Sequence, residues 1–141
     1  MKILVINGPN INFLGIREKN IYGNTNYKDL CAYIEEQGKD LGLEVQVVQS
    51  NIEGEIINFI QEAYGKYDGI VINPAAYTHY SIAIMDAIKA VNIKTVEVHI
   101  SNIHSREEFR RKSVIAPACI GQISGFGTYG YVMALMALKN C

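Results

Sequence analysis

Short apolar segments alternate with amphipathic helical patterns along the chain. The first segment, residues 3–6, is apolar at every position, which is typical of a parallel strand covered on both faces. A single helical pattern separates each strand-like segment from the next, and parallel strands joined in this way have right-handed crossovers. The sequence therefore predicts an α/β fold, most simply a flavodoxin-like three-layer domain. Its five-stranded parallel sheet has the order 2-1-3-4-5, with helices on both faces.

Residues at the ends of these segments place their boundaries. Asn26 is suited to cap a helix that ends at Gly42, and Ser81 is suited to cap another helix. Ser105 and Glu108 have the spacing of a capping box on a short helix. The expected strands cover residues 3–6, 44–49, 69–72, 95–100 and 119–124, and the remaining helices cover residues 53–64, 82–92 and 128–139.

Length and composition limit the classes of protein to consider. We expect one domain, residues 1–141. With 49% hydrophobic residues and a formal net charge of -1, the chain has no basic excess, so nucleic acid is not an expected partner. The cysteines, Cys31, Cys119 and Cys141, lack Cys-x-x-Cys spacing, which favours a reduced, cytoplasmic location. We expect no signal peptide, because the amino terminus has one lysine and then only four apolar residues before Asn7. We expect no membrane partner, because no apolar run is long enough to span a bilayer.

Polar residues directly follow three of the expected strands, at the sheet edge where open α/β proteins bind ligands. Asn7 and Asn10 follow the first strand, and beyond them lies a segment, residues 15–23, with glycine at each end and Arg17 and Tyr22 inside it. This pattern is typical of a mobile lid that carries functional side chains. A surface loop whose arginine and tyrosine are only solvated is an equally good interpretation of this segment alone.

Each of the other two polar loops carries a histidine. His79 follows the third strand, and a histidine beside a helix start is more often a cap or a packed side chain than a catalyst. His99 lies at the end of the fourth strand, and Glu97, two residues earlier, is on the same side of that strand. A carboxylate so placed can hold the imidazole in one tautomer. His99 is therefore the stronger catalytic candidate.

Taken together, these motifs resemble the type II dehydroquinases. The matching segments are Asn7-Gly-Pro-Asn10, Leu14-Gly-x-Arg17-Glu with Tyr22-Gly, Asn73-x-x-x-x-Thr-His79, and Glu97-Val-His99-Ile-Ser-Asn with Arg106-Glu-Glu-Phe-Arg110. The resemblance covers nearly the whole chain in order, and four spaced motifs are more specific than any one of them. It implies an enzyme of the shikimate pathway that dehydrates 3-dehydroquinate to 3-dehydroshikimate through an enolate.

The resemblance also implies the catalytic roles. Tyr22 would remove the proton beside the ketone. Because the pKa of tyrosine is ordinarily near 10, it would need the positive charge of Arg17 to become a phenolate at neutral pH. His99 would protonate the leaving hydroxyl while Glu97 orients its ring, and Asn10 would hold the enolate oxygen, through a water molecule. Such a reaction uses no metal, nucleotide or Schiff-base lysine, so we expect no cofactor.

Substrate contacts are implied in the same way. Asn73, His79 and Arg110 would bind the substrate hydroxyls. The backbone N–H groups of Ile100 and Ser101 would bind the substrate carboxylate, as an anion-binding nest at the end of a strand.

Assembly is implied as well, because members of this family form trimers, and four trimers form a dodecamer. Asp86 would lie at a subunit boundary and reach toward the neighbour's substrate. The alternative interpretation of Asp86 is an exposed acid on the solvent face of its helix. The sequence departs from the family pattern at Met85, where arginine is common, and at Tyr80, where a small hydroxyl residue is common.

Two other motifs invite different interpretations. Residues 125–130 satisfy the Gly-x-Gly-x-x-Gly pattern of dinucleotide-binding sites, but the required second strand and acidic residue are missing before the chain ends at Cys141. We therefore interpret these glycines as positions of close helix packing. Residues 106–112 include four basic residues, but Glu107 and Glu108 lie among them, so we expect a solvated face with Arg110 alone turned to the site.

The competing hypothesis is a non-catalytic flavodoxin-like module, either a flavin carrier or a phosphate-accepting receiver domain. A receiver domain needs acidic residues after the first strand, where this chain has Asn7 and Asn10. A flavin carrier needs a hydroxyl-rich phosphate loop in place of Gly-Pro-Asn. The sequence therefore favours the enzyme.

Overall fold

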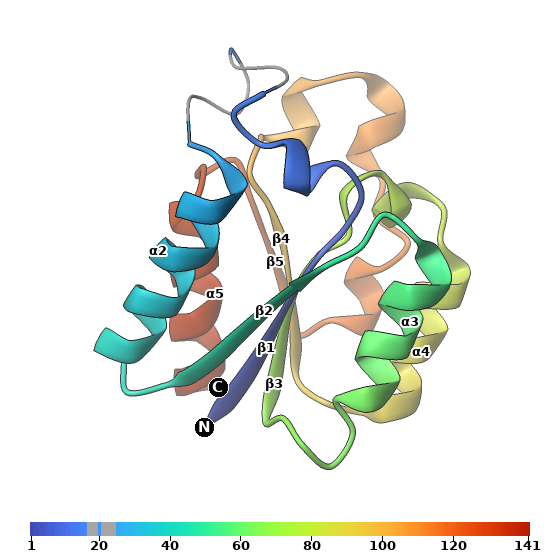
Figure 1. Ribbon diagram of the computed structural model, residues 1–141. Coiled ribbons are helices and arrows are strands. Elements are labelled where there is room, and N and C mark those ends of the chain that lie inside the picture. Colours follow the sequence, from blue (N-terminus) through green and yellow to red (C-terminus); the bar gives the residue numbers. More distant parts are fainter. Residues whose placement is uncertain (17–19, 21–24) are drawn as a thin grey trace.

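The computed structural model describes residues 1–16, 20 and 25–141. Within these residues the sheet has five parallel strands in the order β2-β1-β3-β4-β5 (Figure 1), which confirms the predicted order. The strands are β1 (Lys2–Asn7), β2 (Glu44–Gln49), β3 (Gly69–Asn73), β4 (Thr95–His99) and β5 (Gly121–Ser124). The α-helices are α2 (Tyr27–Asp40), α3 (Glu53–Glu62), α4 (Ile82–Val91) and α5 (Tyr129–Asn140).

Helices cover both faces of the sheet, with α2 and α5 on one side and α3 and α4 on the other (Figure 1). Successive side chains of a strand point to opposite faces. Ile3 and Val5 of β1 accordingly belong to the core beneath α2 and α5, whereas Leu4 and Ile6 belong to the core beneath α3 and α4. Each of these fully buried side chains contributes about 1.5–3 kcal/mol to folding. Two cores on one strand explain why residues 3–6 are apolar without alternation.

Two of the three predicted helix caps are present. The side chain of Asn26 accepts a hydrogen bond from the backbone N–H of Asp29 (2.8 Å), and Ser81 accepts one from the N–H of Ile84 (3.1 Å). In the part of the chain that the structure describes, no helix is both long enough and apolar enough to cross a membrane.

The predicted capping box at Ser105 is wrong. The Ser105 hydroxyl donates to the backbone carbonyl of Asn102 (2.9 Å), because Ser105 closes a preceding 3-10 turn, Ile103–Ser105. The next turn, Glu108–Arg111, follows Glu107 and has no side-chain cap. The start of the fifth strand also differs from the prediction, since a 3-10 turn at Ala116–Ala118 delays β5 until Gly121.

The carboxyl ends of β1 and β3 are joined closely beside the polar loops. Asn7 and Asn73 are partners in the strand register, and the N–H of Gly8 donates to the carbonyl of Asn73 (2.7 Å). A Cβ atom at Gly8 would lie 2.7 Å from the carbonyl oxygen of Pro74, so only glycine allows this approach. The loops after β1 and β3 are thereby held next to each other at the sheet edge.

Candidate active site

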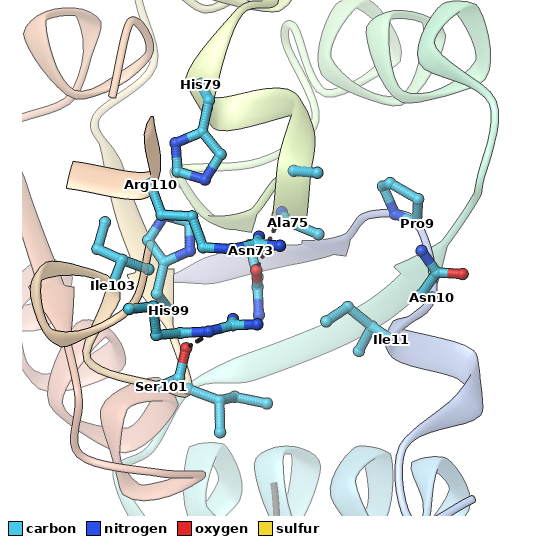
Figure 2. A pocket seen from close by; sticks show the side chains of 13 residues that line it. Pro9, Asn10, Ile11, Asn73, Ala75, His79, His99, Ser101, Ile103 and Arg110 are labelled. Atoms are coloured by element: carbon cyan, nitrogen blue, oxygen red, sulfur yellow. Dashed lines mark hydrogen bonds between the residues drawn. The ribbon is translucent and has the colours of Figure 1, made fainter. Parts of the chain in front are cut away.

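A small polar cavity of about 130 Å³ opens at this edge of the sheet. It lies between the loops that follow β1, β3 and β4 and the turns beyond β4. In Figure 2, His79, His99 and Arg110 lie on one side of the cavity, and Pro9, Asn10 and Ile11 lie on the other. Seven of the residues expected from the sequence line it: Asn10, Asn73, His79, His99, Ile100, Ser101 and Arg110.

The histidine at the end of β4 forms the predicted pair with a carboxylate. His99 Nε2 lies 2.5 Å from Glu97 Oε2, and the exposed fractions of the two residues are 5% and 0%. Because a carboxylate only accepts hydrogen bonds, Nε2 carries the proton in this pair. The Nδ1 atom of His99 is then the ring nitrogen that can exchange a proton with a ligand in the cavity.

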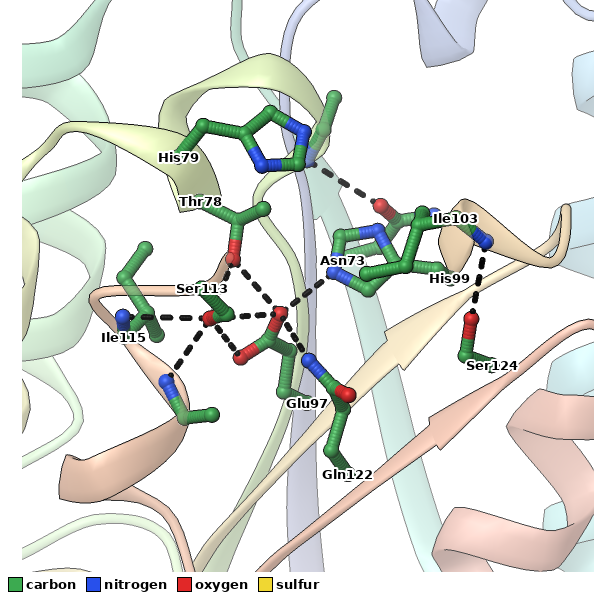
Figure 3. Close-up of polar contacts among 12 residues, drawn as sticks. Asn73, Thr78, His79, Glu97, His99, Ile103, Ser113, Ile115, Gln122 and Ser124 are labelled. Atoms are coloured by element: carbon green, nitrogen blue, oxygen red, sulfur yellow. Dashed lines mark hydrogen bonds and ion pairs between the residues drawn. The ribbon is translucent and has the colours of Figure 1, made fainter. Parts of the chain in front are cut away.

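Glu97 is also held by three neutral side chains, which sequence reasoning did not identify (Figure 3). Its Oε2 accepts hydrogen bonds from the hydroxyl of Thr78 (2.6 Å) and from Nε2 of Gln122 (3.0 Å). Its Oε1 accepts one from the hydroxyl of Ser113 (2.8 Å). These donors come from three different parts of the chain, so no local motif marks them.

These contacts decide the charge of Glu97. Burial alone would raise the pKa of its carboxyl group, but the hydrogen bonds and charge of His99, together with the hydroxyls of Thr78 and Ser113, lower that pKa below its ordinary value. Glu97 is therefore ionised at neutral pH. The carboxylate, 2.5 Å from Nε2, is placed to hold the ring of His99 with Nδ1 free for proton transfer.

The second histidine has its tautomer fixed by the backbone. His79 Nδ1 donates to the carbonyl oxygen of Lys112 (2.7 Å), which can only accept. Nδ1 therefore carries the proton, and the neutral ring presents Nε2 as an acceptor. His79 is thus suited to receive a hydrogen bond from a ligand hydroxyl, as expected from the sequence.

Two arginines contribute to the cavity, whereas the sequence interpretation turned only Arg110 toward it. Arg106 also lines the cavity, and its Nη1 donates to the hydroxyl oxygen of Ser101 (3.3 Å), so the interpretation of Arg106 as part of a solvated face is wrong. Arg110 pairs through Nε with Glu107 (3.0 Å), and its guanidinium lies 4.9 Å from the ring centre of Phe109. Two cationic groups at one small cavity favour an anionic ligand.

The backbone at the end of β4 adds donors of the expected kind. Among the described residues, the N–H groups of Ile100 and Ser101 have no hydrogen-bond partner, and both residues line the cavity. Unpaired N–H groups beside a cation are suited to bind a carboxylate.

Among the expected site residues that the structure describes, two do not line the cavity: Asp86 and Glu97, the latter bound to His99. Arg17 and Tyr22 lie outside the described residues. Asp86 is exposed on α4, outside the cavity lining. Within residues 1–16, 20 and 25–141, no group of three or more His, Cys, Asp or Glu side chains is placed to hold a metal ion.

Gly130 confirms the prediction of close helix packing, whereas Gly125 (φ 99°) and Gly127 (φ 61°) precede α5 and have left-handed backbones. A Cβ atom at Gly130 would lie 3.3 Å from Val98, so α5 approaches β4 closely there. The N–H groups of Gly125 and Gly127 donate to the carbonyls of His99 (3.2 Å) and Ile100 (3.0 Å). The N–H groups of Gly125 and Gly127 therefore hold the backbone at the end of β4 in place.

Comparison with known proteins gives one consistent result. The family model described as dehydroquinase class II matches residues 1–139. The 3-dehydroquinate dehydratase of Clostridium acetobutylicum is 76% identical over 140 residues, covering 99% of this chain and 97% of that protein. One from Clostridium perfringens is 73% identical over 141 residues, covering 99% and 98%. The crystal structure of type II dehydroquinase from Butyrivibrio crossotus superposes with a TM-score of 0.97 at 62% identity, covering 99% and 97% of the two chains.

Proposed function

The chain belongs to the class II dehydroquinase family and dehydrates 3-dehydroquinate, and from this premise we propose that the cavity at the ends of β1, β3 and β4 is its active site. The reaction belongs to the shikimate pathway and yields 3-dehydroshikimate and water through an enolate. The observation that carries the assignment of the cavity is the buried Glu97–His99 pair (2.5 Å), of which His99 lines the cavity. Family membership also rules out the competing hypothesis of a non-catalytic module.

His99 is the general acid of this proposal. The departing hydroxyl needs a proton, and a protonated His99 can deliver it from Nδ1 because Nε2 is bound to Glu97. Asn10, across the cavity, holds the enolate oxygen through a water molecule. Support for the role of Asn10 comes from its place in the cavity lining and from the Asn-Gly-Pro-Asn motif.

Tyr22 is the base, and Arg17 supplies the positive charge that makes it a phenolate. The support for both roles is the match of their motif to the family and their spacing of five residues within one segment. A positive charge beside the phenol favours the phenolate, and each unit of pKa lowering requires about 1.4 kcal/mol of differential stabilisation. Closure of this segment over the cavity excludes water and completes the site.

The remaining polar groups bind the substrate. The N–H groups of Ile100 and Ser101 hold the substrate carboxylate, next to the charge of Arg106. Asn73, His79 and Arg110, which also line the cavity, hold its hydroxyls. The steps are proton transfers between side chains and substrate, so the reaction proceeds without a cofactor.

We propose that the protein assembles as trimers and that four trimers form a dodecamer, in the cytoplasm. The support for the assembly is the family resemblance. In this proposal Asp86, which lies exposed on α4 of the single chain, reaches toward the substrate of a neighbouring subunit. The support for the cytoplasmic location is that Cys31, Cys119 and Cys141 are all free thiols in the structure.

One experiment tests the proposal directly. The protein is treated with a chelator, dialysed and mixed with 3-dehydroquinate, and the ultraviolet absorbance of the conjugated enone product is followed. We expect full turnover after this treatment. Activity that disappears with the chelator and returns only with added metal ion would contradict a reaction carried by side chains alone.

A further inference from the structure

We propose that Tyr131, which lies outside the cavity, is a positioning residue that aims the side-chain amide of Asn73 at the substrate; this inference rests on the substrate-binding role proposed for Asn73. Tyr131 lies in the first turn of α5 and is fully buried. Its hydroxyl group reaches the carboxyl ends of β1 and β3. There it contacts two asparagines that are paired in the strand register, Asn7 and Asn73.

The direction of each hydrogen bond follows from the groups involved. The Tyr131 hydroxyl donates to Asn7 Oδ1 (2.7 Å), since an amide oxygen only accepts. The hydroxyl has one proton, so toward Asn73 it acts as the acceptor, and Asn73 Nδ2 donates to it (2.9 Å). The hydrogen bond with Tyr131 therefore orients the side-chain amide of Asn73, with Nδ2 toward the tyrosine hydroxyl.

A second contact independently requires the same orientation. The backbone N–H of Ala75 can only donate, and its partner is Asn73 Oδ1 (3.2 Å). With both ends of the amide assigned, one N–H of Asn73 Nδ2 is used by Tyr131 and the other remains for the cavity that Asn73 lines. Ala75 has a left-handed backbone (φ 51°), which is unfavourable for a residue other than glycine. The hydrogen bond from its N–H to Asn73 helps to hold this conformation, and Ala75 also lines the cavity.

The environment of Tyr131 keeps this arrangement constant. Burial raises the pKa of its phenol well above the ordinary value, so the hydroxyl keeps its proton at neutral pH. Tyr131 is not among the residues that line the cavity. It therefore acts on the substrate through Asn73.

The test combines Tyr131→Phe with Asn73→Ala in a double-mutant cycle. Tyr131→Phe keeps the ring and removes only the hydroxyl, and we expect KM to rise about three- to tenfold with kcat nearly unchanged, because a lost ground-state contact weakens uniform binding. In the Asn73→Ala background the same change should alter KM by less than about twofold, because its target is gone. Tyr129→Phe, at an exposed position on the same helix, is the matched control and should leave KM unchanged.

A measurement without substrate separates this inference from the proposed function. We expect the side-chain N–H₂ signals of Asn73 in a ¹⁵N NMR spectrum to shift in Tyr131→Phe and not in Tyr129→Phe. If Asn73→Ala raises KM but these signals stay unchanged, or if Tyr131→Phe has the same effect on KM in both backgrounds, the inference is overturned while the proposed function stands. If Asn73→Ala itself leaves KM unchanged, Asn73 does not bind substrate and the inference fails with that role.

A second variant guards against poor folding of Tyr131→Phe, which leaves Asn7 Oδ1 without its donor. In Asn7→Leu/Tyr131→Phe both partners of that hydrogen bond become apolar, a change that can be nearly neutral for folding. The double variant still removes the acceptor of Asn73 Nδ2, so we expect the same rise in KM. A folded double variant with an unchanged KM also overturns the inference.

Discussion

Replacing Glu97 with glutamine removes a negative charge from beside His99 while keeping the shape of the side chain. Glu97 is fully buried and is not part of the cavity lining, so the change alters no direct contact with the substrate. The amide oxygen can keep its hydrogen bonds from His99, Thr78 and Gln122. The amide nitrogen then faces Ser113 Oγ, which already accepts from the N–H groups of Ile115 and Ala116, so the hydrogen bond to Ser113 is lost. We expect a folded protein that loses this one hydrogen bond and the charge.

The size of the effect follows from the geometry of the pair. The nearest atoms of the pair are 2.5 Å apart, and the two charges are each spread over a whole group, so their centres are about 4 Å apart and attract each other by about 4 kcal/mol at an effective dielectric constant of 20. Part of this is retained, because the amide oxygen of the glutamine still accepts the hydrogen bond from His99, so about 2 to 4 kcal/mol of stabilisation of the imidazolium is lost. If His99 must be protonated for the hydroxyl to leave, kcat falls about thirty- to thousand-fold. KM should change by less than about threefold.

The assay is steady-state kinetics by the absorbance of the enone product, with Glu44→Gln as the control. Glu44 is paired with Lys2 at the surface (3.8 Å), so its neutralisation should leave kcat within about twofold. A Glu97→Gln variant with a kcat close to that of the parent, or one with a large rise in KM at constant kcat, would refute the reasoning that the carboxylate acts on the acid.

The same variant has a thermodynamic signature. The pKa of Glu97 is lower in the folded protein than in the unfolded chain, so the folded state binds fewer protons. The corresponding stability is present above about pH 4.3, the ordinary value for glutamate, and is lost as the pH falls toward the folded value. Urea unfolding of the parent should show this loss, and Glu97→Gln should lack that component.

Four further outcomes are expected. Tyr22→Phe should lower turnover by several orders of magnitude and still bind substrate, so a near-normal rate would remove Tyr22 as the base. His99→Ala should fail chiefly at loss of the hydroxyl, and solvent proton exchange beside the ketone should decline less than turnover; an equal decline would leave the acid role without support. Size-exclusion chromatography with light scattering should give a mass that is a multiple of three subunits. A stable, active monomer would contradict the role proposed for Asp86. A thiol reagent at neutral pH should label the exposed Cys141 quickly and the half-buried Cys119 far more slowly until the protein unfolds, because burial and the charge of Glu97 raise the pKa of Cys119 to about 12; equally rapid labelling of folded Cys119 would contradict this.

Much of the fold and of the active site was accessible from the sequence, because the relevant signals are local. The caps at Asn26 and Ser81 act over three residues, and the pairing of Glu97 with His99 follows from the period of a strand. The capping box at Ser105 failed although its spacing was correct. Ser105 closes the turn Ile103–Ser105, and the next turn begins at Glu108 with Glu107 as its N-cap, so Ser105 is not placed to cap it; this depends on how the chain turns after β4.

The supports of the active site could not be predicted in this way. The hydrogen bonds to Glu97 come from 16, 19 and 25 residues away, and Tyr131 reaches Asn7 across 124 residues. Arg106 lies at the cavity and contacts Ser101. The sequence did not predict this contact, because the charged residues next to Arg106 are typical of a solvated face. Each contact depends on where a strand or helix ends in space.

The sequence by itself determined the alternation of strands and helices, the two-sided burial of β1 and the loops that carry the polar residues, since these follow from side-chain periodicity and short-range backbone geometry. The tertiary structure alone decided which nitrogen of His79 and of His99 carries the proton, and how the amide of Asn73 is turned. Those choices depend on hydrogen-bond partners from distant segments, which become neighbours only when the parallel strands bring their carboxyl ends to one edge.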